Sequence, residues 1–339
     1  MKNRSNNHYA PNFLDRCHLG FLNLVVYALL PHSKAERDEL MLSRPLRAGE
    51  LNGLWPRPWL YMRTLLLFVV VLLMLFFCWW QEGRYEESHL LPGLTVVGAL
   101  AIPVTLLIFF WEINKWRTLT LLDVLRYFLI GSCLAITITF IVQYVLKMVS
   151  DEPIVYNERG NYFTPGMMME YGSMPLVITA CVEEFAKAFA IMLILLRWRG
   201  SLHIFHGILV GAAVGAGFAV FESAGYIATD IKNLLFGILF RSLTTPACHV
   251  AWGALMGGVL ALSQVKGERS QVKGGLRPVR LFVFAAAAYV LVCTLHFAWN
   301  YLLVESYPIN RSIELTVLTW FLLLLLIWKG VREVAQSAS

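Results

Sequence analysis

Long apolar stretches separated by short polar segments make up most of this chain. Eight of them approach or exceed the roughly 18 residues that a helix needs to cross a hydrocarbon core about 30 Å thick. The first is the shortest and can be extended back to Leu60. We therefore predict an all-α integral membrane protein with about eight transmembrane helices, at residues 64–80, 90–111, 124–146, 172–196, 202–228, 243–263, 281–304 and 313–328.

Lysine and arginine are spread unevenly over the polar segments between these stretches. The N-terminal segment through Arg63 holds nine of them, and the loop 264–280 holds five. The alternate loops are poor in them, and the loop after the first span has Arg84 alone. Because basic loops stay on the cytoplasmic side of a membrane, the pattern predicts that the N- and C-termini are both cytoplasmic. It also accounts for the net charge of +6 without a nucleic-acid partner.

The composition supports a bilayer location and argues against a disulfide framework. Hydrophobic residues make up 58% of the chain, whereas soluble domains are about 45–50% apolar. Five of the six cysteines lie within predicted spans and no two are spaced as CxxC, so neither a redox motif nor a zinc knuckle is indicated. We expect no cleavable signal peptide. The apolar run 19–30 is long enough only for a helix on the membrane surface or buried in the protein.

Polar content divides the chain into four regions. We expect residues 1–62 to form a cytoplasmic segment with an interfacial helix, and 63–171 to contain the first three spans and a long outer loop. The region 172–304 holds four closely spaced spans that carry the suspicious polar residues. Residues 305–339 form the last span and a cytoplasmic tail.

Ionisable and amide side chains interrupt the apolar sequence of four consecutive spans. A charge at the centre of a bilayer is costly, so an intramembrane ionisable residue is a candidate for a functional site. The residues are Glu183, Glu184 and Lys187 in the fourth span, Glu222 in the fifth, His249 in the sixth, and His296 and Asn300 in the seventh.

Spacing and depth predict that these residues form a single site. Lys187 follows Glu183 by four positions and Glu184 by three, so on a helix it can neutralise either acid. His296 and Asn300 are four positions apart and share one helix face. With a rise of about 1.5 Å per residue, the four spans bring their polar residues into one layer roughly 10 Å thick, in the outer half of the membrane.

Glycines four positions apart run along the fifth and sixth spans. Small residues at this spacing let membrane helices approach closely, as a compact intramembrane cluster requires. Ordinary helix packing explains the glycines equally well, but it does not explain the carboxylates. The glycines are Gly207, Gly211 and Gly215 in the fifth span, and Gly253 and Gly257 in the sixth.

The residue types suit the attack of water on an amide carbonyl. A carboxylate in a poorly solvated site can act as a general base near neutral pH. Histidine and asparagine side chains can donate hydrogen bonds to the oxyanion that develops. The sequence contains no G-x-S-x-G, H-E-x-x-H or P-loop stretch that would indicate another mechanism.

At these residues the sequence resembles the PrsW family of intramembrane proteases, part of a superfamily that includes the CAAX prenyl endopeptidases. The resemblance rests on four stretches in the family's order and covers residues about 175–305. The stretches are "EEFAK" (183–187), "GAAVGAGFAVFES" (211–223), "RSLTTPACHVAWGAL" (241–255) and "LHFAWNYL" (295–302).

The resemblance implies a role for each polar residue. Glu183 and Glu184 match the family's paired acids, and we expect Glu184, or failing that Glu183, to be the base that activates water, with Lys187 in support. Glu222 stands where the prenyl endopeptidases have a histidine, so their mechanism does not transfer whole. The remaining catalytic candidates are the membrane histidines His249 and His296 and the oxyanion donor Asn300.

The resemblance leaves the cofactor open between a metal-free glutamate mechanism, which we favour, and zinc. If zinc is bound, its candidate ligands are Glu184, Glu222, His249 and His296, which offer the oxygen and nitrogen donors that zinc accepts.

The expected function is proteolysis of a membrane-anchored protein, such as an anti-sigma factor, in the bacterial cytoplasmic membrane. The expected partners are that substrate and membrane lipid. A proton-coupled transporter also needs intramembrane charges, but here they gather at one depth and form no relay. A non-catalytic scaffold is the other alternative, and such a protein would be expected to have lost part of the set Glu184, His249, His296 and Asn300.

Overall fold

Helices occupy all eight positions predicted from the apolar stretches. In the computed structural model, the described residues are 25–26, 28–31, 58–83, 88–149, 173–198, 201–229, 238, 248–263, 277–304 and 308–338. The helices are α5 (Leu60–Glu82), α6 (Leu91–Ile113), α7 (Leu121–Ile130), the π-helix η1 (Gly131–Ala135), α8 (Ile136–Val149), α10 (Met174–Leu196), α11 (Ile204–Thr229), Cys248–Ser263, α13 (Arg277–Val304) and α14 (Pro308–Ala338).

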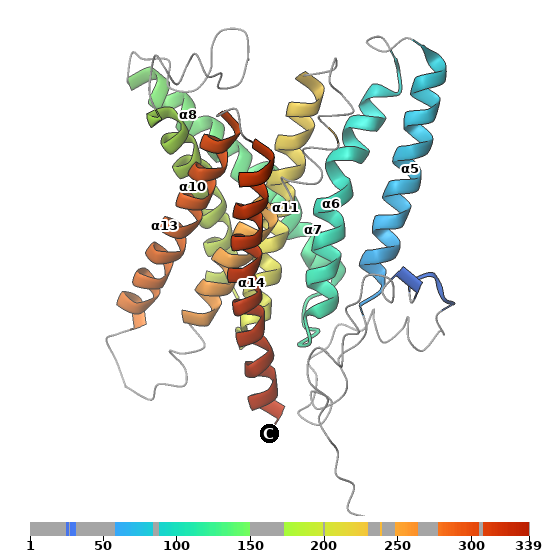
Figure 1. The fold of residues 1–339 in the computed structure, drawn as a ribbon. Coiled ribbons are helices and arrows are strands. Elements are labelled where there is room, and N and C mark those ends of the chain that lie inside the picture. Colours follow the sequence, from blue (N-terminus) through green and yellow to red (C-terminus); the bar gives the residue numbers. More distant parts are fainter. Residues whose placement is uncertain are drawn as a thin grey trace, which may run out of the picture.

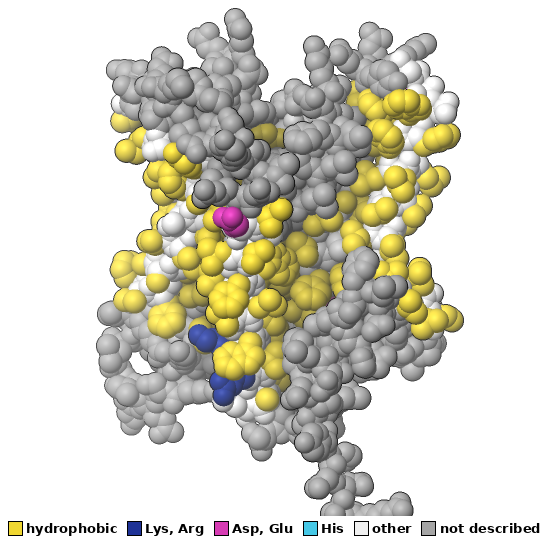
Figure 2. Space-filling model, in the orientation of Figure 1, with side chains coloured by type: hydrophobic (Ala, Val, Ile, Leu, Met, Phe, Trp, Pro, Cys, Tyr) yellow, Lys and Arg dark blue, Asp and Glu magenta, His cyan; other side chains and the backbone are white. Residues whose placement is uncertain are grey.

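Six of the helical segments in the described part of the chain are long and apolar enough to cross a membrane. They are α5, α6, the continuous α7–η1–α8 segment, α11, α13 and α14. The two others are α10, which contains two glutamates and a lysine, and Cys248–Ser263, which is shorter. Figure 2 shows a broad belt of hydrophobic side chains on the surface, with Lys and Arg toward the end that carries the C-terminus. The count of eight spans stays a prediction.

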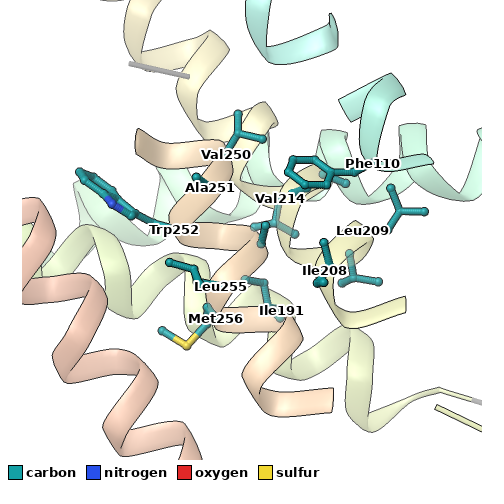
Figure 3. Close-up of a cluster of buried hydrophobic side chains, with 14 of the residues drawn as sticks. Phe110, Ile191, Ile208, Leu209, Val214, Val250, Ala251, Trp252, Leu255 and Met256 are labelled. Carbon is teal, nitrogen blue, oxygen red and sulfur yellow. The ribbon is translucent and has the colours of Figure 1, made fainter. Parts of the chain in front are cut away.

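Helix α11 is the centre of the bundle, and most of it is buried. Helices α6, α7 and η1 pack directly against α11, and α5 packs on α6 at one edge (Figure 1). On the other side α10 packs against α13, α8 and η1, while α14 contacts α13 and α11. The apolar core fills the space between α10, α11 and the helix Cys248–Ser263, where Figure 3 labels Ile191, Ile208, Val214, Val250 and Leu255 among others.

The helix Cys248–Ser263 crosses α11 at backbone-to-backbone contact. A Cβ atom added to any of the paired glycines would overlap a backbone oxygen of the facing helix, so no larger residue fits there. This confirms the close packing expected from the spacing of the glycines. The facing pairs are Gly207 with Gly257, Gly211 with Gly253, and Gly215 with the backbone of His249.

Two buried glutamates cap the N-termini of other helices, a feature that sequence analysis did not predict. The carboxylate of Glu112, at the end of α6, accepts hydrogen bonds from the backbone N–H groups of 59–61 at distances of 2.8–2.9 Å. Near the C-terminus, Glu333 accepts from the backbone N–H of Ile204 at 2.9 Å and contacts the His203 ring at 2.9 Å. Because the first N–H groups of a helix lack partners within it, these carboxylates complete α5 and α11.

The third span contains a π-helical turn that the apolar pattern did not reveal. At η1 the helix lies so close to α11 that a Cβ atom on Gly131 would overlap the backbone of Val214. One residue further on, the Ser132 hydroxyl donates to the carbonyl oxygen of Gly217 at 3.1 Å. The π turn therefore lies where the third span packs closely against α11.

The N-terminal region is described only in part. Of the predicted short helix 19–30, the residues 25–26 and 28–29 are helical. Ala28 is buried beside Met62, and the Arg63 side chain donates hydrogen bonds to the carbonyl oxygens of Ala28 and Leu30. Most of the predicted segment 1–62, up to residue 57, and the predicted outer loop 150–171 lie outside the described residues.

Candidate active site

Helix α10 presents both glutamates and the lysine to the interior of the bundle. Glu183, Glu184 and Lys187 are 8%, 2% and 1% exposed. The Lys187 ammonium donates to Oε1 of Glu184 at 2.5 Å. The sequence allowed Lys187 to pair with either glutamate. In the structure it pairs with Glu184, three positions earlier in the chain.

The His249 ring joins the lysine to a third acid. Its Nδ1 lies 2.9 Å from Nζ of Lys187, and because an ammonium group has only donors, Nδ1 accepts this hydrogen bond. The proton of the neutral ring is then on Nε2, which lies 2.8 Å from Oε2 of Glu222 on α11. His249 thus carries a chain of contacts from α10 to α11.

The His296 ring bridges the two neighbouring glutamates of α10. Its Nδ1 lies 2.8 Å from Oε1 of Glu184, an oxygen that also accepts from Lys187. Since a carboxylate only accepts, Nδ1 is the donor here. The opposite nitrogen, Nε2, faces Oε2 of Glu183 at 3.7 Å. The edge of the network is therefore formed by two groups that face each other, Nε2 of His296 and the carboxylate of Glu183.

Aromatic side chains frame the cluster and hold its rings. The Trp252 indole stacks on His296 with ring centroids 4.9 Å apart and meets His249 edge-on at 5.2 Å. Its N–H donates to the Thr319 hydroxyl of α14 at 3.4 Å. On the other side, Nζ of Lys187 lies 4.4 Å from the centre of the Phe218 ring. These contacts exclude water and fix the histidine orientations, which strengthens the electrostatic interactions within the cluster.

Asn300 occupies the predicted position but is not joined to this network. It lies one turn beyond His296 on α13 and is half-buried. Among the described residues, its amide has no hydrogen-bond partner. The structure thus brings six of the seven predicted residues into one connected cluster and leaves the asparagine beside it.

The cluster also contains a compact set of metal-ligating atoms. Glu183, His249 and His296 each offer one donor atom, and the three atoms lie within 4.8 Å of one another. This set differs from the zinc ligands expected from the sequence, because it contains Glu183 in place of Glu184 and Glu222. In the structure Glu184 is bonded to Lys187 and His296, and Glu222 contacts His249.

Comparisons with known proteins identify the family of this chain. A sequence model of the "PrsW family intramembrane metalloprotease" matches residues 120–328, which is more than half of the chain. Curated relatives named "Protease PrsW" include one from Bacillus subtilis, 24% identical over 72% of this chain and 95% of its own length. Another, from Clostridioides difficile, is 23% identical over 62% of this chain and 84% of its own length. No solved structure matches the chain.

Proposed function

This chain belongs to the PrsW family of intramembrane proteases, and we propose that the cluster around Glu183 hydrolyses a peptide bond of a membrane-anchored protein. The chain is a multi-pass integral membrane peptidase with bacterial relatives. The observation that carries the proposal for the site is the convergence of three carboxylates, a lysine and two histidines from four helices within the apolar bundle. Ionisable groups inside a membrane are costly, so a cluster of six of them is a candidate for a functional site.

The geometry favours Glu183 over Glu184 as the general base. Glu184 already accepts from both Lys187 and His296 through one oxygen, so its role in the proposal is to orient these two groups. Glu183 is the more exposed of the two acids, and its carboxylate faces the ring nitrogen of His296 that has no hydrogen on it. A water between these two acceptors would present its lone pair to a substrate carbonyl.

In the proposed reaction, the water oxygen attacks the carbonyl carbon of the scissile bond while its proton passes to Glu183. The amide of Asn300, which has no described partner, donates to the resulting oxyanion. Collapse of the tetrahedral intermediate breaks the C–N bond, and the proton on Glu183 passes to the leaving amine. The lysine keeps Glu184 charged, so His296 stays in the tautomer that accepts from the water.

The donor atoms of the cluster fit a zinc ion as well. Glu183, His249 and His296 offer one oxygen and two nitrogens within 4.8 Å of one another, which is the donor set of many catalytic zinc sites. A zinc ion held there would supply a nucleophilic water at neutral pH. In that case Glu184 and Glu222 would not bind the metal themselves. Each would contact one of the metal-binding histidines and fix its orientation, as carboxylates commonly do for metal-bound histidines.

The substrate and the topology belong to the same proposal. With the predicted eight spans and cytoplasmic termini, the cluster lies in the outer half of the membrane. A single-pass protein such as an anti-sigma factor would then be cut near its outer membrane edge.

The test is a cleavage assay with purified protein in liposomes and candidate single-pass substrates. Glu183→Gln is expected to abolish cleavage, because a neutral amide cannot take the proton, and to leave the thermal stability within a few degrees of the parent. The matched control is Glu314→Gln, an exposed glutamate on α14, which should cleave normally. Full activity of Glu183→Gln would refute the assignment of the base.

The two mechanisms differ in their dependence on metal. Metal analysis of the purified protein, together with treatment by a chelator, separates them. Loss of activity with the chelator and its return with zinc would establish the zinc-dependent mechanism. Activity that persists without bound metal would establish the glutamate reading.

A further inference from the structure

A cavity that does not include the residues of the catalytic cluster opens at the end of the bundle that carries the C-terminus. It has a volume of about 850 Å³. Arg197, one of its lining residues, lies 14 positions after Glu183 along α10, which corresponds to about 21 Å along the helix. On α10 the lining reaches inward as far as Ala190, and no residue of the catalytic cluster lines the cavity. The mouth of the cavity therefore lies at a different depth from the cluster, and nothing in the catalytic proposal uses the cavity.

Two helix faces form the walls of the cavity. Arg126, Ile130 and Leu134, from α7 and η1, line one side at helical spacing, and Leu193 and Arg197 of α10 line the other. Further along the bundle α10 packs against η1 and α8. The two walls thus meet on the side of the cavity away from the C-terminal end of the bundle. Between them lies an apolar cleft, with Arg126 and Arg197 at its open end.

The arginines are placed at the mouth of the cavity and are weakly engaged. Arg126 and Arg197 are both exposed. The nearest described acid is Asp123, 4.0 Å from the Arg126 guanidinium, and its other oxygen is bonded to the backbone N–H and hydroxyl of Thr120. Both guanidinium groups are available to an anion, and guanidinium forks match the oxygens of a phosphate.

A buried donor without a partner belongs to a residue in the wall of the same cavity. Trp116 lines the cavity, is 8% exposed and stacks on His203 with ring centroids 3.4 Å apart. Its indole N–H finds no hydrogen-bond acceptor within the described part of the chain. Buried N–H groups are nearly always satisfied, so this one indicates a ligand acceptor such as an ester or phosphate oxygen.

We propose that this cavity binds one anionic phospholipid. Its phosphate lies between Arg126 and Arg197, and the Trp116 N–H donates to an oxygen of the headgroup or the ester. An acyl chain follows the apolar cleft along Ile130, Leu134 and Leu193. Basic pockets between transmembrane helices on the cytoplasmic side bind anionic headgroups in this way, and aromatic rings at the membrane interface are typical of the same depth.

The dimensions and lining favour a headgroup with one acyl chain over two other occupants. A helix about 10 Å wide fills roughly 80 Å³ per Å of length, so the cavity would hold only about seven residues of a substrate helix. A free phosphate ion would need the arginines but not the apolar cleft that continues beyond them.

The experiment is native mass spectrometry of the full-length protein with equal amounts of phosphatidylglycerol and phosphatidylcholine. We expect preferential retention of phosphatidylglycerol. Replacing both arginines, in Arg126→Gln/Arg197→Gln, should weaken it about 25-fold, because each basic residue near a membrane surface contributes about fivefold in affinity. Trp116→Phe keeps an aromatic ring for the stack on His203 but removes the N–H, and it should weaken lipid binding severalfold. Leu193→Trp should also weaken lipid binding, because the larger side chain narrows the cleft.

The matched control is Arg332→Gln, which removes an exposed arginine of α14 that stacks on Trp328 outside the cavity. It should bind lipid like the parent protein. Equal retention of the two lipids, or equal loss in Arg332→Gln and the double variant, would overturn the proposal. Displacement of the lipid by millimolar inorganic phosphate would also overturn it, since binding would then require only the anion.

Discussion

Lys187 holds the buried charges of the catalytic cluster together. It is 1% exposed and contacts Glu184, His249 and the Phe218 ring. Removing one partner of a buried ion pair is strongly destabilising because it leaves the other charge without compensation. At the scale of single residues, the cluster should therefore behave as one unit.

Lys187→Met is expected to lower the free energy of unfolding by about 3–5 kcal/mol, because it leaves the Glu184 carboxylate buried without its cation. Unfolding measured in detergent or bicelles checks this value. The double variant Lys187→Met/Glu184→Met should recover part of the stability but no activity. A single variant as stable as the parent would show that Glu184 is neutral or solvated.

In the zinc mechanism, Glu222 would act on the reaction only through His249, the metal-binding ring that it orients. Glu222→Gln keeps an oxygen at the same place and should lower kcat/KM by about 10–100-fold, the usual cost of losing a carboxylate that orients a histidine. Its thermal stability should stay close to that of the parent. Steady-state cleavage kinetics measure the effect, and complete inactivation equal to that of Glu183→Gln would instead indicate direct participation.

At the scale of helices, the close contact between α11 and Cys248–Ser263 positions two of the four helices of the site. The backbone of His249 lies directly opposite Gly215, so any change in helix separation moves its ring away from Lys187. The glycine ladder is therefore part of the catalytic geometry as well as of the fold.

Gly211→Ala is expected to destabilise the protein and to reduce activity, because its Cβ would overlap the carbonyl group of Gly253. Gly225→Ala, on the same helix, meets nothing within 4 Å and should be neutral or stabilising by up to about 1 kcal/mol. Thermal unfolding of both variants, alongside cleavage, checks the contrast. Equal behaviour of the two would show that the helices can separate at no cost.

The sequence predicts the helices well because each apolar stretch is long, and length together with apolar composition indicates a helix that can span a membrane. It also predicts the cluster, since intramembrane charges are rare. It could not choose between Glu183 and Glu184 as the partner of Lys187, because both spacings are within reach on a helix. The cap by Glu112 was missed for a different reason: its partners lie 51–53 positions earlier in the chain, and no local pattern connects them.

At the scale of the whole molecule, the start of α5 and the C-terminus lie toward the same end of the bundle (Figure 1). This agrees with an even number of spans. The candidate catalytic cluster and the proposed lipid site then occupy different depths, with the lipid site at the end that is rich in arginine and tryptophan.

Reporter fusions test this arrangement. Reporters that are active only in the cytoplasm are expected to be active at both the N-terminus and the C-terminus, because the positive charges favour that side. The same reporter placed in the loop between α5 and α6 should be silent. An active reporter in that loop, or opposite signals at the two termini, would contradict the predicted topology.

The two glutamate caps have a consequence for the order in which the protein is made. The N-terminus of α5 obtains its acceptor from the end of α6, so the first helix is completed only when the second has been inserted beside it. The N-terminus of α11 waits longer, because Glu333 follows Ile204 by 129 positions. Helix α14 thus completes the central helix, and a chain truncated before Glu333 would enter the membrane without the acceptor for the first N–H of α11.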